Sequence, residues 1–500
     1  MAWEGIAIFV VLSALVTVLG FVAARWRRGD LDLLDEWGLA GRRFGTVVTW
    51  FLLGGDLYTA YTFVAVPALV AGSGGLGIYA LTYSIISFPI AYATMPKLWR
   101  VAKNRGYVTA ADYVKDRFDS RLLALLVAIT GIIATMPYVA LQIFGIAVVI
   151  HQMGVNVDAA LVTSFLVLAV FTYVSGLRAP ALIAFVKDSL LWIAVLVIIV
   201  VVPIKLGGYG AIFSKIPEAK LIPAPSVYAG YATLALGSAF ALFLYPHAIT
   251  ANLASRSDAV IKRNTAILPA YTFMLGMIAI MGFMALAAGF KPSPPYGANA
   301  AVPQLIDQMF PSSFSGFAFA AIAIGALVPA SVMSIAAANL FNRNIYREFF
   351  RPSISAKEET RVSQIVSLLV KLGALLFVAS GQSKQAINLQ LAGGIWMMQT
   401  LPAVFLALYV RWLDRWGVIA GWAVGMAFGT FWVVEDNFAS TLHTFAFGGG
   451  GGIKLYGGLV AFALNLAVVV VWSLIARAVR GRGEPAGHLS ERDYQVAGVE

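Results

Sequence analysis

Long runs of apolar residues occupy most of the chain, and short polar stretches separate them. Each run has about the 20 residues that a helix needs to cross a bilayer. Lipid offers the backbone no hydrogen-bond partner, so the runs must be helical, whereas a transmembrane β-barrel would show short alternating segments. The pattern predicts 13 spans, at about 4–24, 45–72, 75–98, 122–150, 158–177, 180–204, 227–251, 266–289, 314–340, 363–380, 391–410, 416–434 and 456–476.

The basic residues predict how these spans are oriented. With the N-terminus outside, 27 of the 35 Lys and Arg residues fall on the inside, six fall outside, and Lys187 and Lys371 lie within spans. Cytoplasmic loops of membrane proteins carry such an excess. We therefore expect the N-terminus outside and the C-terminus inside. The net charge of +11 then reflects contact with anionic lipid and not with nucleic acid.

Short connections predict one transmembrane domain over residues 1–480, followed by a disordered cytoplasmic tail over 481–500. The run Gly448 to Gly452 is typical of a flexible outside loop. The absence of cysteine excludes disulfides and thiol catalysis, and four scattered histidines argue against a His-ligated metal site. We expect no cofactor and no obligate protein partner.

Polar residues inside spans indicate a candidate site, because a charge at membrane depth costs at least about 2.5–3.5 kcal/mol. Asp56 follows Gly54 and Gly55 in the second span. Each glycine weakens the helix by about 1 kcal/mol relative to alanine. An opened helix exposes carbonyls that can coordinate a cation or a substrate amine. The alternative is that the glycines permit close helix packing and that Asp56 caps the turn.

Other spans carry weaker signals of the same kind. Pro329 removes a backbone donor from the ninth span, which frees earlier carbonyls or simply kinks the helix. Gln142 in the fourth span is suited either to a ligand or to a bond between helices. Tyr245 and His247 lie in "LFLYPHAIT" of the seventh span, where the histidine could carry protons or make a structural hydrogen bond.

Six motifs, in order along the chain, resemble the sodium:solute symporter family. They are "DEWGLAGRRFG" (35–45), "GGDLYTAYTFVAVPALVAGSG" (54–74), "VTAADYVKDRF" (108–118), "YVSGLRAPALIAFVKD" (173–188), "NRNIYREF" (342–349) and "LPAVFLALYVRWLDRWGVIAGWAVG" (401–425). The resemblance covers nearly the whole chain and includes the 13-span topology.

This resemblance implies an all-α, multi-pass protein of the cell membrane with an inverted-repeat transporter fold. Spans 2–6 (about 45–204) and 7–11 (about 227–410) would form two five-helix repeats. The broken second and seventh spans would meet at a central site that is exposed by alternating access. An intramembrane enzyme would need a Ser/His, paired-Asp or metal cluster, and a channel would need a filter or charge rings. The sequence shows neither, so we expect a transporter and not an enzyme.

The family's site residues carry over in part. Asp56 falls on the second-span aspartate, and Gly54 and Leu57 fall where backbone carbonyls bind sodium. Asp188 falls on the signature aspartate.

Elsewhere the chain departs from the family pattern. Aligned without gaps, the two hydroxyl ligands of sodium in the ninth span fall on Val328 and Pro329, which have no side-chain oxygen. The threonine before the signature aspartate is replaced by Lys187. A one-turn slip of the alignment would place Ser331 near the site and restore one hydroxyl.

These departures suggest that the Lys187 ammonium occupies or neighbours the vacated cation site, so that protonation replaces sodium binding. Asp188 would pair with it, or would face the inner water path. Proton coupling, sodium coupling with one bound sodium ion, and uniport all remain open. Lys187 could also extend to the inner surface, because it lies nine residues past Arg178.

The wording of "LRAPALIAFVKD" and "LFLYPHAIT" is most similar to the monocarboxylate permease branch of the family. That similarity implies a small carboxylate such as lactate, pyruvate, acetate or propionate. The alternative is a sodium-coupled symporter for proline, alanine or another small solute. Lys371 in the tenth span would meet the carboxylate, or would reach a helix-end carbonyl or a lipid phosphate. Further candidate substrate contacts are Asp56, Tyr58, Thr59, Gln142, Tyr245 and His247.

Overall fold

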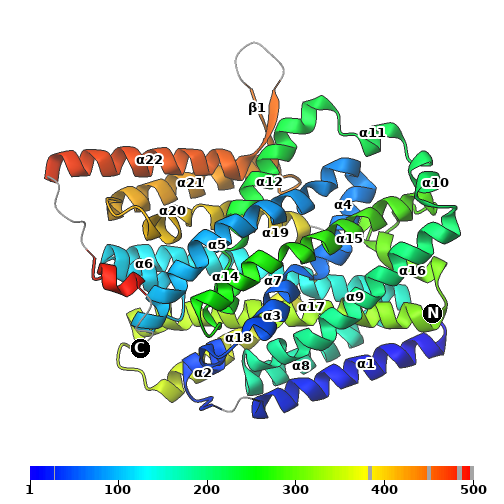
Figure 1. Ribbon diagram of the computed structural model, residues 1–500, viewed down its shortest axis with the longest axis horizontal. Helices are drawn as coiled ribbons and strands as arrows, with labels where there is room; N and C mark the ends of the chain where they lie inside the picture. Colours follow the sequence, from blue (N-terminus) through cyan, green and yellow to red (C-terminus); the bar gives the residue numbers. More distant parts are fainter. Residues whose placement is uncertain (27–28, 381–385, 447–451, 481–486, 496–500) are drawn as a thin grey trace.

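The computed structural model describes residues 1–26, 29–380, 386–446, 452–480 and 487–495. Within helices, the side chains of residues 56, 57, 386, 387, 389 and 480 also lie outside the described part. The chain folds into one bundle of roughly parallel and antiparallel helices (Figure 1). In the described residues, ten helices are long and apolar enough to cross a membrane, or up to 12 if each of two bent pairs is one span.

The first half of the bundle follows the predicted spans closely. Its helices are α1 (Trp3–Val22), α2 (Leu34–Leu39), α3 (Thr46–Leu57), the π-helical turn η3 (Tyr61–Ala65), α4 (Val66–Ser73), α5 (Tyr79–Arg105), α6 (Ala110–Phe118), α7 (Arg121–Met153), α8 (Val157–Ser175), α9 (Arg178–Leu206), α10 (Tyr209–Ser214) and α11 (Glu218–Leu221). The second predicted span is therefore divided at residues 58–60. A 3-10 segment at Gly74–Ile78 joins α4 to α5, and Tyr61–Arg105 counts as one of the ten candidate spans, so the predicted number of 13 stays a prediction.

The second half contains two bent helix pairs. Its elements are α12 (Tyr228–Leu242), α13 (Pro246–Leu253), α14 (Asp258–Ile267), α15 (Pro269–Ala287), α16 (Ala301–Met309), α17 (Ser312–Phe341), the π-helix η7 (Asn342–Phe350), α18 (Ala356–Ala379), α19 (Ala386–Met398), α20 (Leu401–Val404), α21 (Arg415–Glu435), β1 (Leu442–Phe445), β2 (Ile453–Tyr456), α22 (Gly457–Arg480) and the 3-10 turn η10 (Glu491–Tyr494). The chain bends by 45° between α12 and α13, and by 48° after Met398. The break predicted from Gly54-Gly55 and the broken seventh span are thus confirmed.

An antiparallel hairpin between α21 and α22 was not predicted. Strands β1 and β2 pair with His443 opposite Leu455. Tyr456 at its end packs on α12, where a Cβ at Gly237 would lie 2.5 Å from the tyrosine ring. Apart from Gly452, the predicted glycine loop lies outside the described residues.

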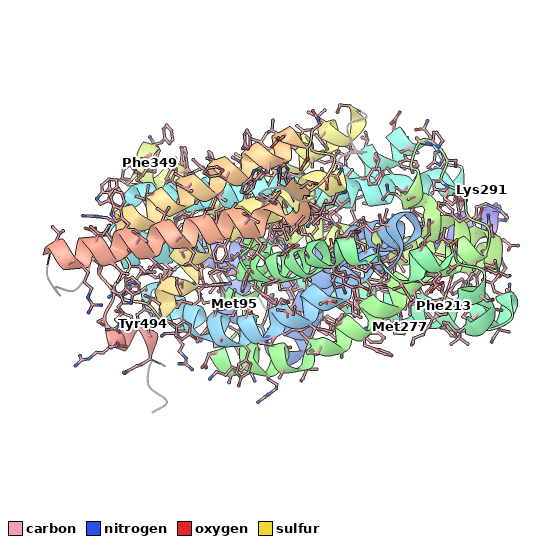
Figure 2. The ribbon with its side chains drawn as sticks, turned by 90° about the horizontal axis from the view of Figure 1, so that it is seen from above. Met95, Phe213, Met277, Lys291, Phe349 and Tyr494 are labelled. Carbon is pink, nitrogen blue, oxygen red and sulfur yellow. The ribbon has the colours of Figure 1, made fainter. Side chains whose placement is uncertain are left out.

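Loops predicted to share one side of the membrane lie at one end of the bundle. Phe349 and Tyr494 lie near one end in Figure 2, and Phe213 and Lys291 lie near the other. Arg100 pairs with Asp258 at 2.5 Å, which joins the C-terminal part of α5 to the first residue of α14. These contacts agree with the predicted topology, and the orientation relative to a membrane stays a prediction.

Part of the C-terminal tail is folded against this end. Arg105 at the end of α5 donates to both carboxylate oxygens of Asp493, at 2.7 and 2.8 Å. The backbone N–H of His488 donates to the carbonyl of Asp116 in α6 at 2.8 Å. The predicted disorder of residues 481–500 therefore does not extend to residues 487–495, because an Arg–carboxylate pair and backbone hydrogen bonds hold them.

The Arg105–Asp493 pair makes this docking sensitive to acid. The Arg105 guanidinium, which hydrogen-bonds Asp493, lowers the pKa of that carboxyl to about 2. A lowered carboxyl pKa favours docking above the ordinary pKa near 3.8, and that contribution is lost as the pH falls toward 2. We expect Asp493→Asn to speed amide hydrogen exchange in residues 487–495 at neutral pH. Arg492→Gln, an exposed neighbour, is the control. Equal exchange in all three proteins would contradict this role.

Candidate functional site

The central feature of the site is the break between α3 and the turn η3. Tyr58 follows α3 with φ −95° and ψ 90°, so the helix cannot continue. Gly54 lies against the ring of Tyr271 from α15, and a Cβ there would be 2.1 Å from that ring. Close packing and an opened helix, which were predicted as alternatives, therefore occur together. Gly54 allows Tyr271 to pack closely, and the helix ends a few residues later.

The ammonium of Lys187 lies where the carbonyls of this break converge. Its Nζ donates to the carbonyl of Gly55 at 2.5 Å and to that of Tyr58 at 3.1 Å. It also lies 3.0 Å from Oδ1 of Asp188. The Lys187 side chain is fully buried, so it does not extend to the inner surface. A Cβ at Gly55 would come within 2.9 Å of the ammonium, which explains why glycine suits this position.

The carbonyls that face Lys187 are each one residue beyond the predicted pair, Gly54 and Leu57. The Gly54 carbonyl instead accepts the N–H of Tyr58 at 3.2 Å. The side chains of Asp56 and Leu57 lie outside the described residues.

Tyr271 contacts both Asp188 and Tyr58 and so completes a cluster with Lys187 at the break. Tyr271 was not among the candidate residues chosen from the sequence. Its hydroxyl donates to Oδ2 of Asp188 at 2.8 Å, and its carbonyl accepts from the hydroxyl of Tyr58 at 2.7 Å. The Tyr58 and Tyr271 rings lie 4.8 Å apart. The available signal was a tyrosine within the eighth apolar run, but nothing in the sequence indicates which helix it faces.

Helix α17 borders the cluster without supplying a hydroxyl. Val328 and Pro329 are buried within α17 and offer no side-chain oxygen. Ser331 turns toward α8, with its Oγ 3.2 Å from Oγ1 of Thr172. Gly325 of α17 lies near the break, since a Cβ there would be 3.9 Å from the Tyr58 carbonyl oxygen. Pro329 has no N–H to donate to the Gly325 carbonyl four residues earlier.

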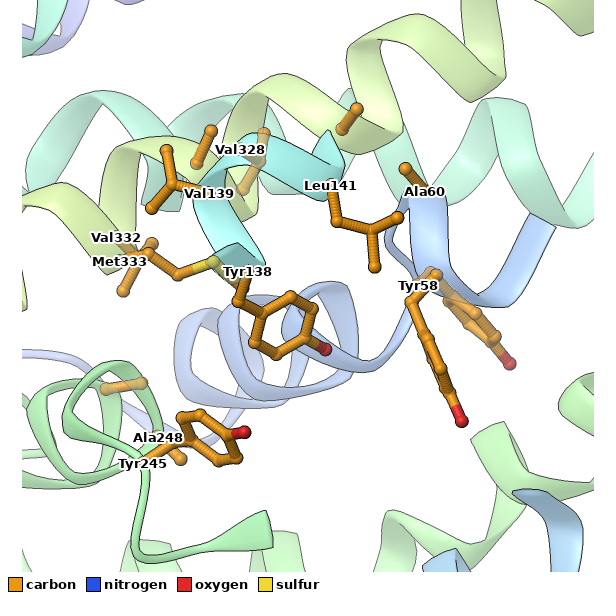
Figure 3. Close-up of a cluster of buried hydrophobic side chains, with 14 of the residues drawn as sticks. Tyr58, Ala60, Tyr138, Val139, Leu141, Tyr245, Ala248, Val328, Val332 and Met333 are labelled. Atoms are coloured by element: carbon orange, nitrogen blue, oxygen red, sulfur yellow. The ribbon is translucent and has the colours of Figure 1, made fainter. Parts of the chain in front are cut away.

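Helix α7 connects the two broken spans. One turn apart on α7, Gln142 accepts the N–H of Ala60 at 2.9 Å, while the Tyr138 ring lies 5.4 Å from His247. Figure 3 shows Tyr138 between Tyr245 on one side and Tyr58 on the other.

The polar side chains at these breaks mostly bond the backbone. Thr59 accepts the N–H of Tyr61 through Oγ1 at 3.0 Å, and Tyr245 donates to the carbonyl of Gln390 at 3.2 Å. His247 is buried in the first turn of α13. Gln142, Thr59 and Tyr245 therefore stabilise the opened chain.

A small cavity lies beside the second break. Pro246 and Thr250 of α13, Gly131 of α7 and Ala336 of α17 line its walls. Thr109, at the start of α6, also lines it, and Thr109 is held by a hydrogen bond of 2.8 Å to Asn344. The cavity thus lies between the first turns of α13 and the start of α6.

Lys371 is not part of this cluster. Its Nζ donates to Oγ of Ser367 on its own helix, at 2.8 Å. Ser367 in turn donates to Ser334 of α17 at 3.2 Å. No group of three or more His, Asp or Glu side chains suited to a metal occurs in the described part of the chain.

Comparison with known proteins agrees with this architecture. The model of the sodium:solute symporter family matches residues 37–425. The chain belongs to the sodium:solute symporter family. It is 50% identical over 474 residues to a "Monocarboxylate transport permease protein" of Rhizobium johnstonii, covering 93% of this chain and 96% of the relative. It is 23% identical to the "Sodium/proline symporter" of Escherichia coli, covering 92% of this chain and 91% of the relative.

A solved structure shares the fold. The chain is similar to a sodium-coupled sialic acid symporter with a TM-score of 0.76, at 16% identity and with coverage of 98% and 100%. Members of a symporter family are transporters and not enzymes. The chain is therefore a multi-pass membrane symporter for a small molecule and a co-transported ion.

Proposed function

We propose that this symporter takes up a small monocarboxylate together with protons, and that Lys187 replaces the sodium ion. The observation that carries the proposal is the position of the Lys187 ammonium between the carbonyls of Gly55 and Tyr58. The ammonium stabilises the exposed carbonyl oxygens of the opened helix, as a bound cation would. Hard cations need several oxygen ligands, and α17 supplies no hydroxyl here.

The substrate assignment rests on the relative from R. johnstonii and on the chemistry between the breaks. The eight residues of α13 begin at Pro246, so the positive end of the helix dipole points into this space. The rings of Tyr58, Tyr138 and Tyr245 give this region an aromatic, mostly apolar character (Figure 3). A short carboxylate with an aliphatic body suits this environment.

The fold supports alternating access by two inverted repeats, over about residues 45–204 and 227–410. The paired breaks fall in the first helices of these two segments, as that arrangement requires. We retain 13 spans, with the N-terminus outside and the C-terminus inside, as part of the proposal. The cavity below the second break would then open toward the cytoplasm.

A second candidate is sodium-coupled uptake of proline, alanine or a similar solute. It is favoured by the relative from E. coli named as a sodium/proline symporter and by Asp56, whose carboxylate would suit a substrate amine.

Uptake by the purified protein in liposomes distinguishes the two candidates. We expect labelled lactate or pyruvate to accumulate under an inward proton gradient without sodium. Accumulation only with a sodium gradient, at any pH, would contradict proton coupling, and accumulation of proline alone would contradict the substrate assignment.

A further inference from the structure

A second lysine is buried at membrane depth, away from the proposed coupling site. Lys371 is the sixteenth residue of the 24-residue helix α18 and has no exposed surface. Its hydrogen bonds form a chain, from Nζ to Ser367, from Ser367 to Ser334, and from Ser334 to the carbonyl of Ser331 at 2.8 Å. This chain accepts one N–H of the lysine but supplies no negative charge.

The helices that pack against α18 place no charge opposite Lys371 in the described part of the chain. Helix α17 contains no acidic or basic residue along its length. The charged groups of the other elements lie near their ends: Arg121 and His151 on α7, Asp158 on α8, Asp35 and Glu36 on α2, Arg343, Arg347 and Glu348 on η7, and Lys357, Glu358, Glu359 and Arg361 on α18 itself. Arg361 is ten residues from Lys371, which is about 15 Å along a helix.

A permanent ammonium in this place would be costly. An unpaired buried charge costs several kcal/mol, whereas Lys187 has the Asp188 carboxylate beside it. Lys371 can hold a proton at low cost only in a conformation that admits water or a counter-charge. Its protonation is therefore tied to the conformation of the helices around it.

Helix α17 separates the two lysines and contacts both clusters. Gly325 approaches the carbonyl that binds Lys187, and Ser334 belongs to the Lys371 chain. These residues are nine positions apart, which at about 100° per residue places them on opposite faces of the helix. A movement of α17 would thus change the surroundings of both lysines together.

We propose that Lys371, with Ser367 and Ser334, is a second proton-binding site of the transport cycle. The proposal rests on the proton coupling proposed above. The amine binds one proton from the outer water and releases it to the inner water, and no bond other than this N–H forms or breaks. Two protons then accompany each carboxylate, so one net positive charge enters per turnover.

The test measures charge movement in liposomes with labelled lactate, a fixed pH gradient and a potassium–valinomycin potential. We expect an interior-negative potential to increase uptake by the wild type and by Lys357→Met, an exposed lysine of the same helix. Lys371→Met should retain uptake driven by the pH gradient but lose its response to the potential. An equal response in Lys371→Met and the wild type would overturn the proposal.

The wild type alone keeps the proposal testable if the variant fails to fold. Its reversal potential gives the number of protons per lactate, and a value of one would overturn a second proton site while leaving proton coupling in place. Wild-type uptake that ignores the pH gradient would instead refute the proposed function and this inference with it.

Discussion

Lys187→Met is expected to abolish proton-driven uptake. The substitution keeps an unbranched side chain, one atom shorter, but removes the ammonium that donates to the carbonyls of Gly55 and Tyr58. Hydrogen bonds from a charged donor are worth about 1.5–3 kcal/mol each, so the loss of two exceeds a tenfold effect. The measurement is the initial rate of lactate uptake in liposomes across a series of outside pH values. We expect a low rate that no longer rises with the proton gradient.

Lys205→Met is the matched control, because Lys205 lies at the other end of the same helix and is exposed. It should keep the wild-type rate and pH profile. A Lys187→Met protein with an unchanged pH profile would show that the proton binds elsewhere. Exchange of labelled for unlabelled lactate at equal pH shows whether the variant still binds and moves its substrate.

The sequence predicts where the helices of this protein lie along the chain better than it predicts which face each helix turns toward its neighbours. Apolar runs fix which segments cross the membrane, and the glycine pair indicates where the second span opens. Whether Gly54 or Gly55 turns its carbonyl toward Lys187 depends on a rotation of about 100° about the helix axis, which the sequence does not determine. The carbonyls that face Lys187 therefore lie one residue beyond those predicted to bind sodium, and the sodium ligands stay a prediction.

The same limit explains why the contacts of Tyr271 and Lys371 were not predicted. Tyr271 joins Asp188 to the break through contacts between residues 83 and 213 positions apart, and one sequence carries no trace of such pairings. Lys371 was a candidate for contact with the substrate because it lies in a core helix, with a helix-end carbonyl or a lipid phosphate as the alternative partner, and its role stays a prediction. The structure shows it bonded to Ser367, on the far side of α17 from the central site. The identity of these polar residues was informative, but their partners were not predictable.

Asp188→Asn is expected to destabilise the protein more than removal of the whole pair. Asp188 and Lys187 are both fully buried, with Oδ1 and Nζ 3.0 Å apart. Removing one partner of a buried ion pair leaves an uncompensated charge and typically costs about 3–5 kcal/mol. Thermal unfolding in detergent should therefore show a clear decrease in Tm for Asp188→Asn.

The double variant Lys187→Met/Asp188→Asn should recover much of that loss, because an apolar and an amide side chain leave no unpaired charge. It should still lack pH-driven uptake, since the ammonium is gone. Tyr271→Phe is the control for the other contact of the carboxylate, because it removes one hydrogen bond and no charge. A double variant no more stable than Asp188→Asn would mean that Lys187 is not the charge that Asp188 compensates. The double-mutant cycle thus measures directly whether these two adjacent residues act as one unit.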